Sequence, residues 1–370
     1  MIIGVPKEIK ISENRVGMTE AGVRQLVKEG HTVYVEKDAG LGSLITNEQY
    51  EKAGAKILPS KKEVYAKADM IVKVKEPLSD EYELLKENQI LYTYLHLAAE
   101  PKLTKVLAER KVKSVAYETI QLDNGSLPLL VPMSEVAGRM ATQIGAFYLQ
   151  RDHGGKGVLL GGVTGVRPAK VVIIGGGVVG TNAAKMAVGL GANVTVLDVN
   201  TARLEYLDDI FQGRCMTLFS NTKNIEESVK DADLLVGGVL ITGQKAPTLV
   251  SKEMIASMTK GSVVVDVAVD QGGCIETCKP TSHQNPTYEV DGVIHYCVPN
   301  MPGVVPRTST YALTNVTLKY ASMIAALGVE QAIAKDKALF KGLNVYNGFV
   351  CYEPVAKDLG MEYRPYKPAF

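Results

Sequence analysis

The segment Lys170–Asp198, KVVIIGGGVVGTNAAKMAVGLGANVTVLD, most constrains what this chain can fold into. Its β-branched run, Val171–Ile174, is typical of a strand buried on both faces of a parallel sheet. Gly175, Gly177 and Gly180 follow in G-x-G-x-x-G spacing, and small apolar residues after them predict a helix. A strand, a glycine turn and a helix in this order predict a dinucleotide-binding βαβ unit.

Each glycine of this motif has a physical task. The three positions permit a tight turn, a close approach of the backbone to a pyrophosphate, and close packing of the helix on the strand. The N–H groups of the first helical turn then face the phosphates. A second strand, Val194–Leu197, ends at Asp198, whose carboxylate can accept hydrogen bonds from both ribose hydroxyls and would repel a 2′-phosphate. The segment therefore predicts NAD rather than NADP.

Length and charge limit the classes of protein to consider. A chain of 370 residues exceeds the usual size of one domain, so two domains are expected. A formal charge of +1 argues against a nucleic-acid or anionic membrane surface. The N-terminus, MIIGVPKEIK, does not have the pattern of a signal peptide, and apolar runs stay below the roughly 18 residues of a membrane span. Five cysteines without a C-x-x-C pair predict reduced thiols in a cytoplasmic protein.

The first half of the chain carries the pattern of a second sheet. Short strands alternate with helical segments over residues 1–125, which predicts a doubly wound parallel unit. Capping-box patterns at Thr46-x-x-Gln49 and Ser60-x-x-Glu63 mark the starts of two of its helices, and Thr19 can cap another. This half has no phosphate-binding glycine motif, so we expect it to hold the substrate.

Two long helices are expected between the halves. Leu130–Gln150 predicts one, with Ser134 as its N-cap, and Pro306–Gly328 predicts the other, whereas the tail beyond residue 350 is expected to be mostly irregular. The predicted fold class is α/β, with two doubly wound, Rossmann-like domains joined by long interdomain helices. Residues 1–128 and 307–370 are assigned to the substrate domain, and residues 129–306 to the NAD-binding domain.

Three polar side chains of the first half come after predicted strands. Arg15 lies in GVPKEIKISENRV, Lys75 in VKVKEP and His96 in YTYLHLA. Taken singly, such cations are usually solvated, and a lone histidine at a strand end is more often structural. Because the carboxyl ends of parallel strands meet at one edge of a sheet, the three are expected to converge on one site for an acidic substrate. Because Lys75 is expected to lie near a cationic substrate centre or near Arg15, its pKa is expected to be lowered.

The second half offers an acidic candidate. In VDVAVDQGG, Asp270 either forms a turn before two glycines or transfers protons, and Asp266 is the more structural acid. An imidazole and a carboxylate near a hydride acceptor suit proton transfer at an amine or imine. By the same strand-end rule, Val239, Leu240 and Val267–Asp270 are expected near the cofactor.

Beyond these separate signals, the chain resembles the alanine dehydrogenases along essentially its full length. The resemblance is carried by GVPKEIKISENRV, VKVKEP, YTYLHLA, PMSEVAGRMATQIGA, GGGVVG, VDVAVDQGGCIETCKPTSH and VPNMPGVVPRTST. It implies the reversible, NAD-dependent oxidative deamination of L-alanine to pyruvate and ammonia by a homohexamer.

The resemblance also implies a role for particular residues. Arg15 and Lys75 would hold the substrate carboxylate and its carbonyl or imine side, with His96 as general acid/base and Asp270 as the second acid/base. Besides Gly175, Gly177 and Gly180, the implied cofactor contacts are Ser134, Val178, Val179, Asp198, Arg203, Ser220, Val239, Leu240, Val267, Asn300 and Met301. The metal pair of some relatives would fall at Met323 and Leu327, whose side chains do not ligate magnesium, so no metal is expected.

Three alternatives remain open at this point. The NAD-binding portion of a proton-translocating transhydrogenase is similar in sequence and fold but needs no amino-acid site. A saccharopine-type dehydrogenase would take a bulkier amino acid, and a non-catalytic NAD sensor would need no acid/base groups. The presence of Arg15, Lys75, His96 and Asp270 together favours the alanine dehydrogenase.

Overall fold

The computed structural model describes residues 1–239, 246–269 and 272–367, and the chain forms two compact units. Unit 1 comprises Met1–Met133 and Gly303–Phe370, and unit 2 comprises Ser134–Pro302. The sequence analysis placed the boundaries after residues 128 and 306. Each unit contains one sheet covered by helices, which confirms the predicted α/β class with two Rossmann-like sheets.

Unit 1 is built on an eight-stranded sheet. In sheet order its strands are β15 (Phe349–Val350), β14 (Leu343–Tyr346), β6 (Lys113–Ala116), β5 (Ile90–Thr93), β4 (Met70–Val72), β1 (Ile2–Val5), β2 (Thr32–Glu36) and β3 (Lys56–Leu58). The six strands from β3 to β6 are parallel, and β14 and β15 extend the sheet in antiparallel fashion. The strand order reverses between β1 and β4, and ligands of doubly wound sheets bind outside such a reversal.

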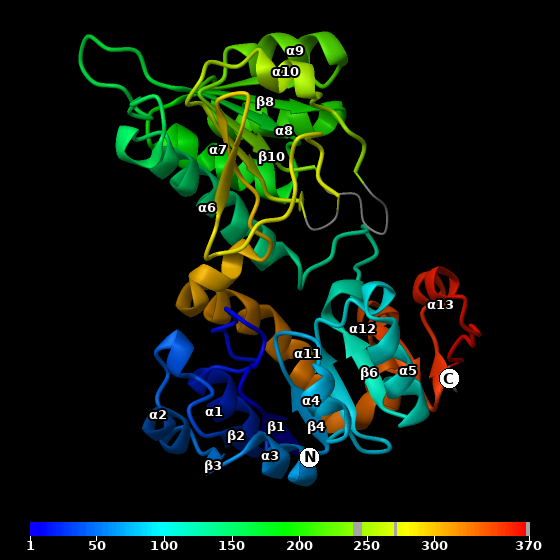
Figure 1. Ribbon diagram of the computed structural model, residues 1–370. Helices are drawn as coiled ribbons and strands as arrows, with labels where there is room; N and C mark the ends of the chain where they lie inside the picture. The colour runs from blue at the N-terminus through cyan, green and yellow to red at the C-terminus, as the bar shows by residue number, and fades with distance from the viewer. Residues whose placement is uncertain (240–245, 270–271, 368–370) are drawn as a thin grey trace. The chain divides into compact units, whose positions relative to one another are not determined.

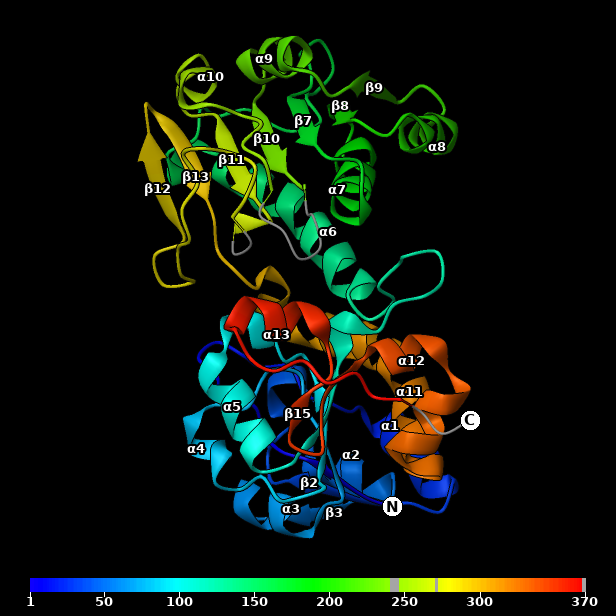
Figure 2. The same cartoon turned by 90° about the vertical axis from the view of Figure 1, so that its right-hand side faces the viewer.

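Helices cover both faces of this sheet (Figure 2). They are α1 (Glu20–Lys28), α2 (Asn47–Lys52), α3 (Lys61–Lys67), α4 (Ser79–Tyr82), α5 (Pro101–Glu109), α11 (Pro306–Lys335), α12 (Lys337–Lys341) and α13 (Glu353–Leu359). The predicted caps of α1, α2 and α3 are confirmed, because Thr19, Thr46 and Ser60 each accept a backbone N–H of the first turn. The Thr46 box is reciprocal, with Gln49 accepting the Thr46 N–H.

The long helix α11 belongs to unit 1. Its regular course is broken at Gly328, which has φ 77° and ψ 164°, at the residue where the sequence predicted its end. Within the described residues it is the one helix that is long and apolar enough to cross a membrane, although one face is buried in unit 1. Tyr92 on β5 donates to the Thr317 carbonyl over 3.1 Å, which ties this helix to the sheet.

The C-terminal tail beyond residue 350 is mostly irregular, as predicted, and α13 is the one helix among its described residues. Val345 of β14, Val350 of β15 and Val355 of α13 join the core that α3 and α5 form over the sheet. These elements are short, and they are stabilised by packing on β6 and α5 rather than by local propensity.

Unit 2 is built on a seven-stranded sheet, whose strands run across Figure 2 in sheet order. They are β12 (Thr287–Val290), β13 (Val293–Tyr296), β11 (Val263–Asp266), β10 (Leu234–Gly237), β7 (Lys170–Ile174), β8 (Asn193–Asp198) and β9 (Cys215–Phe219). All are parallel except β12, which pairs antiparallel with β13. The order reverses between β7 and β10, the same topology as in unit 1.

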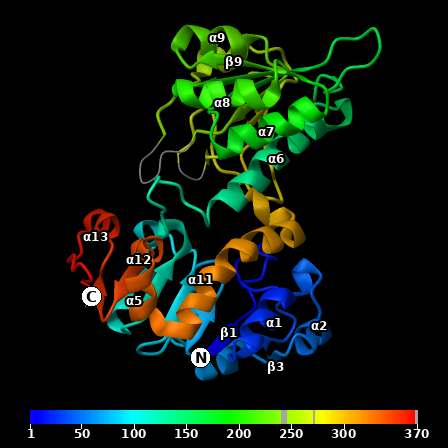
Figure 3. The same cartoon turned by 180° about the vertical axis from the view of Figure 1, so that it is seen from behind.

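The unit 2 helices divide between the faces of its sheet. Figure 3 shows α6 (Val131–Tyr148), α7 (Val178–Gly189) and α8 (Thr201–Phe211) on one side, and Figure 1 shows α9 (Thr222–Lys230) and α10 (Lys252–Ala256) on the other. Helix α6 begins at Val131, so Ser134 lies in its first turn and the prediction that Ser134 is the N-cap is wrong. Pro132 explains the earlier start, since proline is favoured in the first turn.

Candidate active site

Three of the predicted functional residues follow neighbouring strands of unit 1. Arg15 lies in the loop after β1, Lys75 lies three residues after the end of β4, and His96 lies three residues after the end of β5. Val72 and Tyr92 are register partners, so the segments that carry Lys75 and His96 leave the sheet side by side. Thr93 also donates to the Lys75 carbonyl over 3.0 Å. The structure thus brings the three residues to the carboxyl edge at the β1/β4 reversal.

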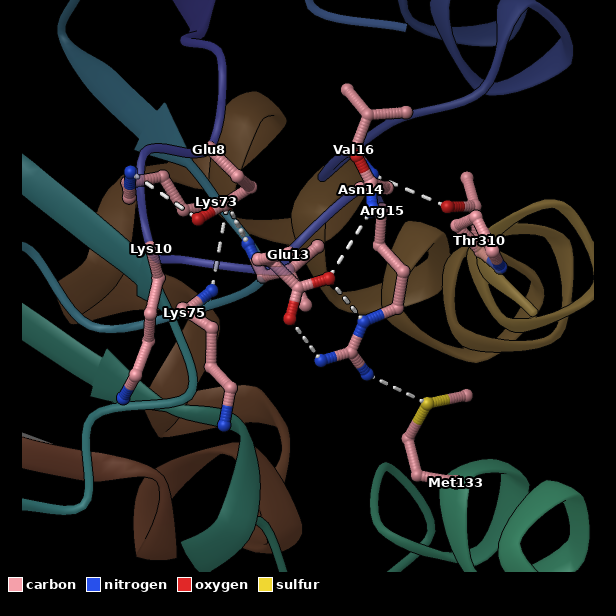
Figure 4. A network of polar contacts seen from close by, with 12 residues as sticks. Glu8, Lys10, Glu13, Asn14, Arg15, Val16, Lys73, Lys75, Met133 and Thr310 are labelled. Atoms are coloured by element: carbon pink, nitrogen blue, oxygen red, sulfur yellow. Dashed lines mark hydrogen bonds and ion pairs between the residues drawn. The ribbon is translucent and has the colours of Figure 1, made fainter. Parts of the chain in front are cut away.

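Arg15 is held by a carboxylate two residues before it (Figure 4). Its Nε and Nη2 each donate to a different oxygen of Glu13 over 2.6 Å, in the bidentate geometry that arginine favours. Nη1 points at Met133 Sδ at 3.1 Å. Burial alone would lower the pKa of Arg15, but the hydrogen bonds and charge of Glu13 raise it. The guanidinium is therefore buried, charged and fixed in orientation.

A buried lysine lies beneath this edge. Lys73 is fully buried, and its ammonium lies 2.8 Å from a Glu81 oxygen and 3.5 Å from a Glu8 oxygen. Burial would lower the pKa of Lys73, whereas the two carboxylates raise it. Glu8 in turn accepts the Val74 N–H over 2.6 Å. The carboxylates thus connect Lys73 to the backbone that leads into Lys75.

Lys75 differs from its neighbouring cations. Lys10, Arg15 and Lys73 each form an ion pair with a carboxylate, whereas no such pair of Lys75 occurs in the part of the chain that the structure describes. Burial and then the nearby charge of Arg15 lower the pKa of Lys75, as the sequence analysis predicted. Figure 4 shows its side chain extending away from the Lys73 network. Lys75 is therefore the cation best placed to pair with an incoming anion.

His96 is exposed and stands on an unusual backbone. Its φ of 50° and ψ of 38° are left-handed, a conformation that costs free energy for a residue other than glycine. Glu118 compensates by accepting the backbone N–H of His96 over 2.6 Å and that of Leu95 over 3.1 Å. The imidazole stacks on Tyr94 with ring centres 5.9 Å apart, and the Tyr94 hydroxyl donates to the Leu129 carbonyl. The imidazole ring is therefore accessible to solvent, while the backbone that carries it is held in place by Glu118.

The glycine turn of unit 2 has the geometry that a pyrophosphate requires. Gly175 has φ 96°, and a Cβ on Gly180 would lie 1.8 Å from the Gly175 carbonyl oxygen, so neither position accepts a larger residue. A Cβ on Gly177 would meet no atom within 4 Å. Gly177 is also the N-cap of α7 and has no side chain to cap it, which leaves the N–H groups near Val178 and Val179 for a ligand. The chain therefore fits a dinucleotide at this turn.

Asp198 and Arg203 border the same turn. Asp198 ends β8 and accepts the Gly176 N–H over 2.6 Å, which leaves carboxylate lone pairs for ribose hydroxyls. Arg203, on α8, donates to the Gly176 carbonyl and to Thr181 Oγ1, both over 2.5 Å. Ser220 follows β9 and donates its N–H to the Asp198 carbonyl. These three predicted contacts are thus brought together at the ends of β8 and β9.

The remaining predicted contacts are placed as follows. Val239 follows β10, and its Cγ2 would lie 2.9 Å from a Cβ added at Gly175. Val267 follows β11, and its N–H donates to the Gly237 carbonyl. Ser134 lies one turn before Gly138, whose α carbon packs against the Val179 carbonyl at the start of α7. Asn300 has a left-handed φ of 56°, and Met301 is buried at the start of a 3₁₀ helix, Met301–Val304. Leu240 and Asp270 lie outside the described residues.

Sequence reasoning missed the residues that hold the predicted ones in place. Glu13 lies within GVPKEIKISENRV and Lys73 within VKVKEP. The sequence of these segments does not distinguish a buried, paired charge from an ordinary surface charge. Glu118 is more distant in sequence from His96, and no local pattern indicated their contact. The one sequence signal for such buried charges was the high density of charged residues in these two segments, directly beside apolar strands.

Comparisons with known proteins identify the family of the chain. The family description "Alanine dehydrogenase/PNT, N-terminal domain" matches residues 4–137, and "Alanine dehydrogenase/PNT, C-terminal domain" matches residues 141–353. The chain belongs to the alanine dehydrogenase/PNT family.

Family members at high identity cover the whole chain. It is 64% identical over 370 residues to the alanine dehydrogenase of Methanococcus maripaludis, covering 100% of this chain and 99% of that protein. It is 59% identical to the alanine dehydrogenase of Bacillus subtilis, covering 100% of this chain and 97% of that protein.

Solved structures of the family show the same fold. A structure titled L-alanine dehydrogenase matches with a TM-score of 0.95 at 54% identity, over 97% of this chain and 99% of that one. A transhydrogenase from Sinorhizobium meliloti matches with a TM-score of 0.81 at 25% identity, over 95% of this chain and 99% of that one.

The buried lysine generates a prediction for stability. Replacing Lys73 by Met leaves Glu8 and Glu81 buried without a cation, which should destabilise the protein by about 3–5 kcal/mol. Urea unfolding followed by circular dichroism measures the change. In the matched control, Lys105→Ala removes an exposed pair with Glu109 and should cost less than about 0.5 kcal/mol. Equal unfolding midpoints for the two variants would contradict the role assigned to Lys73.

Proposed function

We propose that this chain is an L-alanine dehydrogenase that interconverts L-alanine and pyruvate plus ammonia with NAD. The observation that carries the proposal is full-length identity of 64% and 59% to two alanine dehydrogenases. The transhydrogenase alternative is disfavoured, because the match to the transhydrogenase structure has 25% identity against 54% for the L-alanine dehydrogenase structure.

In this proposal unit 1 is the substrate domain and unit 2 the NAD-binding domain. Arg15 and Lys75 bind the alanine carboxylate, and Glu13 fixes the direction of the guanidinium. Holding the substrate in one orientation can contribute on the order of several kcal/mol to catalysis. The glycine turn, Asp198 and Arg203 are the groups that would hold NAD, which would serve as the hydride acceptor for the substrate α carbon.

Two side chains are proposed to transfer protons, the imidazole of His96 and the carboxylate of Asp270. His96 is exposed, and it takes one proton from the water that adds to the iminium carbon as the carbinolamine forms. Asp270 is proposed as the second acid/base, which returns a proton to the departing ammonia. The stacked Tyr94 and the Glu118 bonds keep His96 from swinging away during these steps.

The first test is turnover measured by NADH absorbance. Wild-type protein mixed with NAD and L-alanine should produce NADH, and His96→Ala should reduce the rate by about 10²–10⁴-fold because it removes the proton-transfer group. NADP should support little turnover, because the Asp198 carboxylate would repel its 2′-phosphate.

The control for this test is a second histidine of the same unit. His31 lies beside the N-terminus, at the opposite edge of the sheet, and His31→Ala should keep the wild-type rate. NAD binding without turnover on any amino acid would contradict the dehydrogenase and favour a sensor or a transhydrogenase component.

We further propose a cytoplasmic homohexamer, the assembly that the family resemblance implies. Apolar side chains gather on the unit 2 surface, where Leu159, Val163, Val166 and Leu190 are each more than half exposed. Leu159 and Leu190 line a cavity of about 550 Å³. An exposed apolar surface of this kind is one that a second copy of the chain can cover. Light scattering should therefore give a particle about six times the 39.9 kDa chain, and a mass of one chain would contradict the assembly.

A further inference from the structure

Two cysteines that are far apart in the sequence meet in unit 2. Cys278 and Cys297 lie on neighbouring segments, and their side chains are close enough for each to shift the pKa of the other. Cys297 comes directly after β13 and is fully buried, whereas Cys278 is half-buried on the segment that follows Gly273. Both thiols are free. The sequence analysis treated the five cysteines as scattered, because no short spacing links this pair.

Hydrogen bonds other than the thiol contact hold the two segments side by side. Thr277 Oγ1 lies 2.8 Å from His295 Nε2, and the Thr281 N–H donates to the Cys297 carbonyl over 3.0 Å. Tyr288, on β12, donates from its hydroxyl to the Thr277 carbonyl over 2.8 Å. The proximity of the two sulfurs is therefore set by the fold on both sides of the pair.

The surroundings of the pair favour ionisation of one sulfur. The side chain of Cys278 lowers the pKa of Cys297, and burial opposes this effect only in part. The Tyr288 hydroxyl lies 3.6 Å from Cys297 Sγ, while its proton is donated to the Thr277 carbonyl. A thiolate is the form of cysteine that reacts with oxidants. A thiolate beside a second thiol is also the arrangement found in redox-sensitive cysteine pairs.

Metal binding is a poorer explanation of the pair. Across residues 1–239, 246–269 and 272–367, no three His, Cys, Asp or Glu side chains are grouped so that they could hold a metal ion. Cys274 lies in the same region, but it is fully buried in the core formed by β10, β11 and α9, and its N–H is directed at Asp266.

We propose that Cys278 and Cys297 are an oxidative modification site, at which a peroxide converts the two thiols into one disulfide. One thiolate attacks hydrogen peroxide, which breaks the O–O bond, forms a sulfenic acid and releases hydroxide. The other sulfur then attacks the sulfenic sulfur, forming the S–S bond and releasing the second oxygen as water. Two thiols and one peroxide thus give one disulfide and two waters, with two electrons passing from sulfur to oxygen.

The disulfide would alter the part of unit 2 that we assign to the cofactor. Its sulfurs lie about 2.05 Å apart, closer than two sulfurs that are not covalently bonded, so the two segments must move together. Cys297 is three residues before Asn300, and Cys278 follows the segment that begins beside Asp266. This consequence rests on the proposed function, in which Asn300 and Met301 contact NAD. Because a misplacement of about 1 Å can cost about 100-fold in rate, oxidation should lower kcat/KM for alanine at least about tenfold.

The experiment treats the full-length reduced protein with hydrogen peroxide and follows covalent state and function separately. Intact mass should fall by two hydrogens, peptide mapping should link Cys278 to Cys297, and titratable thiols in denaturant should fall from the five of the reduced chain by two. NADH fluorescence should show weakened binding, and a reducing thiol should restore both binding and turnover.

Single variants separate this pair from the other cysteines. Cys278→Ser and Cys297→Ser should each abolish the cross-link and the reversible loss of activity. In the matched control, Cys351→Ser lies in unit 1 and should respond like the wild type. A cross-link that joins other cysteines, or a Cys278–Cys297 link that leaves NADH binding unchanged, would overturn the proposal. The mass and thiol readouts hold even if the protein does not turn over alanine, so a failure here is distinct from a failure of the proposed function.

Discussion

The ion pair between Glu13 and Arg15 is the interaction on which the unit 1 site depends. A buried guanidinium is stable only when a carboxylate neutralises it and satisfies its N–H groups, and Glu13 does both with two bonds of 2.6 Å. The same requirement explains why Lys73 lies between Glu8 and Glu81. Lys75 forms no ion pair with a carboxylate within the described residues, so its charge is available, beside the fixed guanidinium of Arg15, to a substrate carboxylate.

The topology of the two sheets explains why the functional residues gather where they do. In both units the strand order reverses beside the first strand, between β1 and β4 and between β7 and β10. Loops that leave the sheet on either side of such a reversal diverge and leave room for a ligand. At this reversal unit 1 has cationic side chains, whereas unit 2 has the glycine turn. The same topology therefore offers two different kinds of anion site. In the proposed function, charged side chains bind the substrate in the first, and backbone N–H groups bind the cofactor in the second.

The sequence predicted those features that depend on local chemistry. The glycine turn, the Thr46 box and the strands that precede Lys75 and His96 depend on spacing within a few residues, and each is present. The roles of Arg15 and His96 came from family resemblance and stay predictions.

Features that depend on contacts between distant segments could not be predicted. Glu118 reaches His96 from the end of β6, Cys278 meets Cys297 through the edge of the unit 2 sheet, and β14 joins β6 from the C-terminal region. None of these pairs has a local signature, because the sheet brings the partners together only after it has formed. The left-handed backbone conformation of His96 could not be predicted from the sequence either, because it is stabilised by Glu118 rather than by neighbouring residues.

The pH dependence of pyruvate binding to the NADH-bound protein tests the role of Lys75 most directly. The lowered pKa means that Lys75 loses its proton at a lower pH than an ordinary lysine, so affinity for the pyruvate carboxylate should fall as pH rises through that value. In Lys75→Arg the side chain stays charged, and affinity should be nearly constant between about pH 7 and 10. Lys10→Arg, at a cation that already has a carboxylate partner, should follow the wild type. Identical pH profiles for wild type and Lys75→Arg would contradict the account.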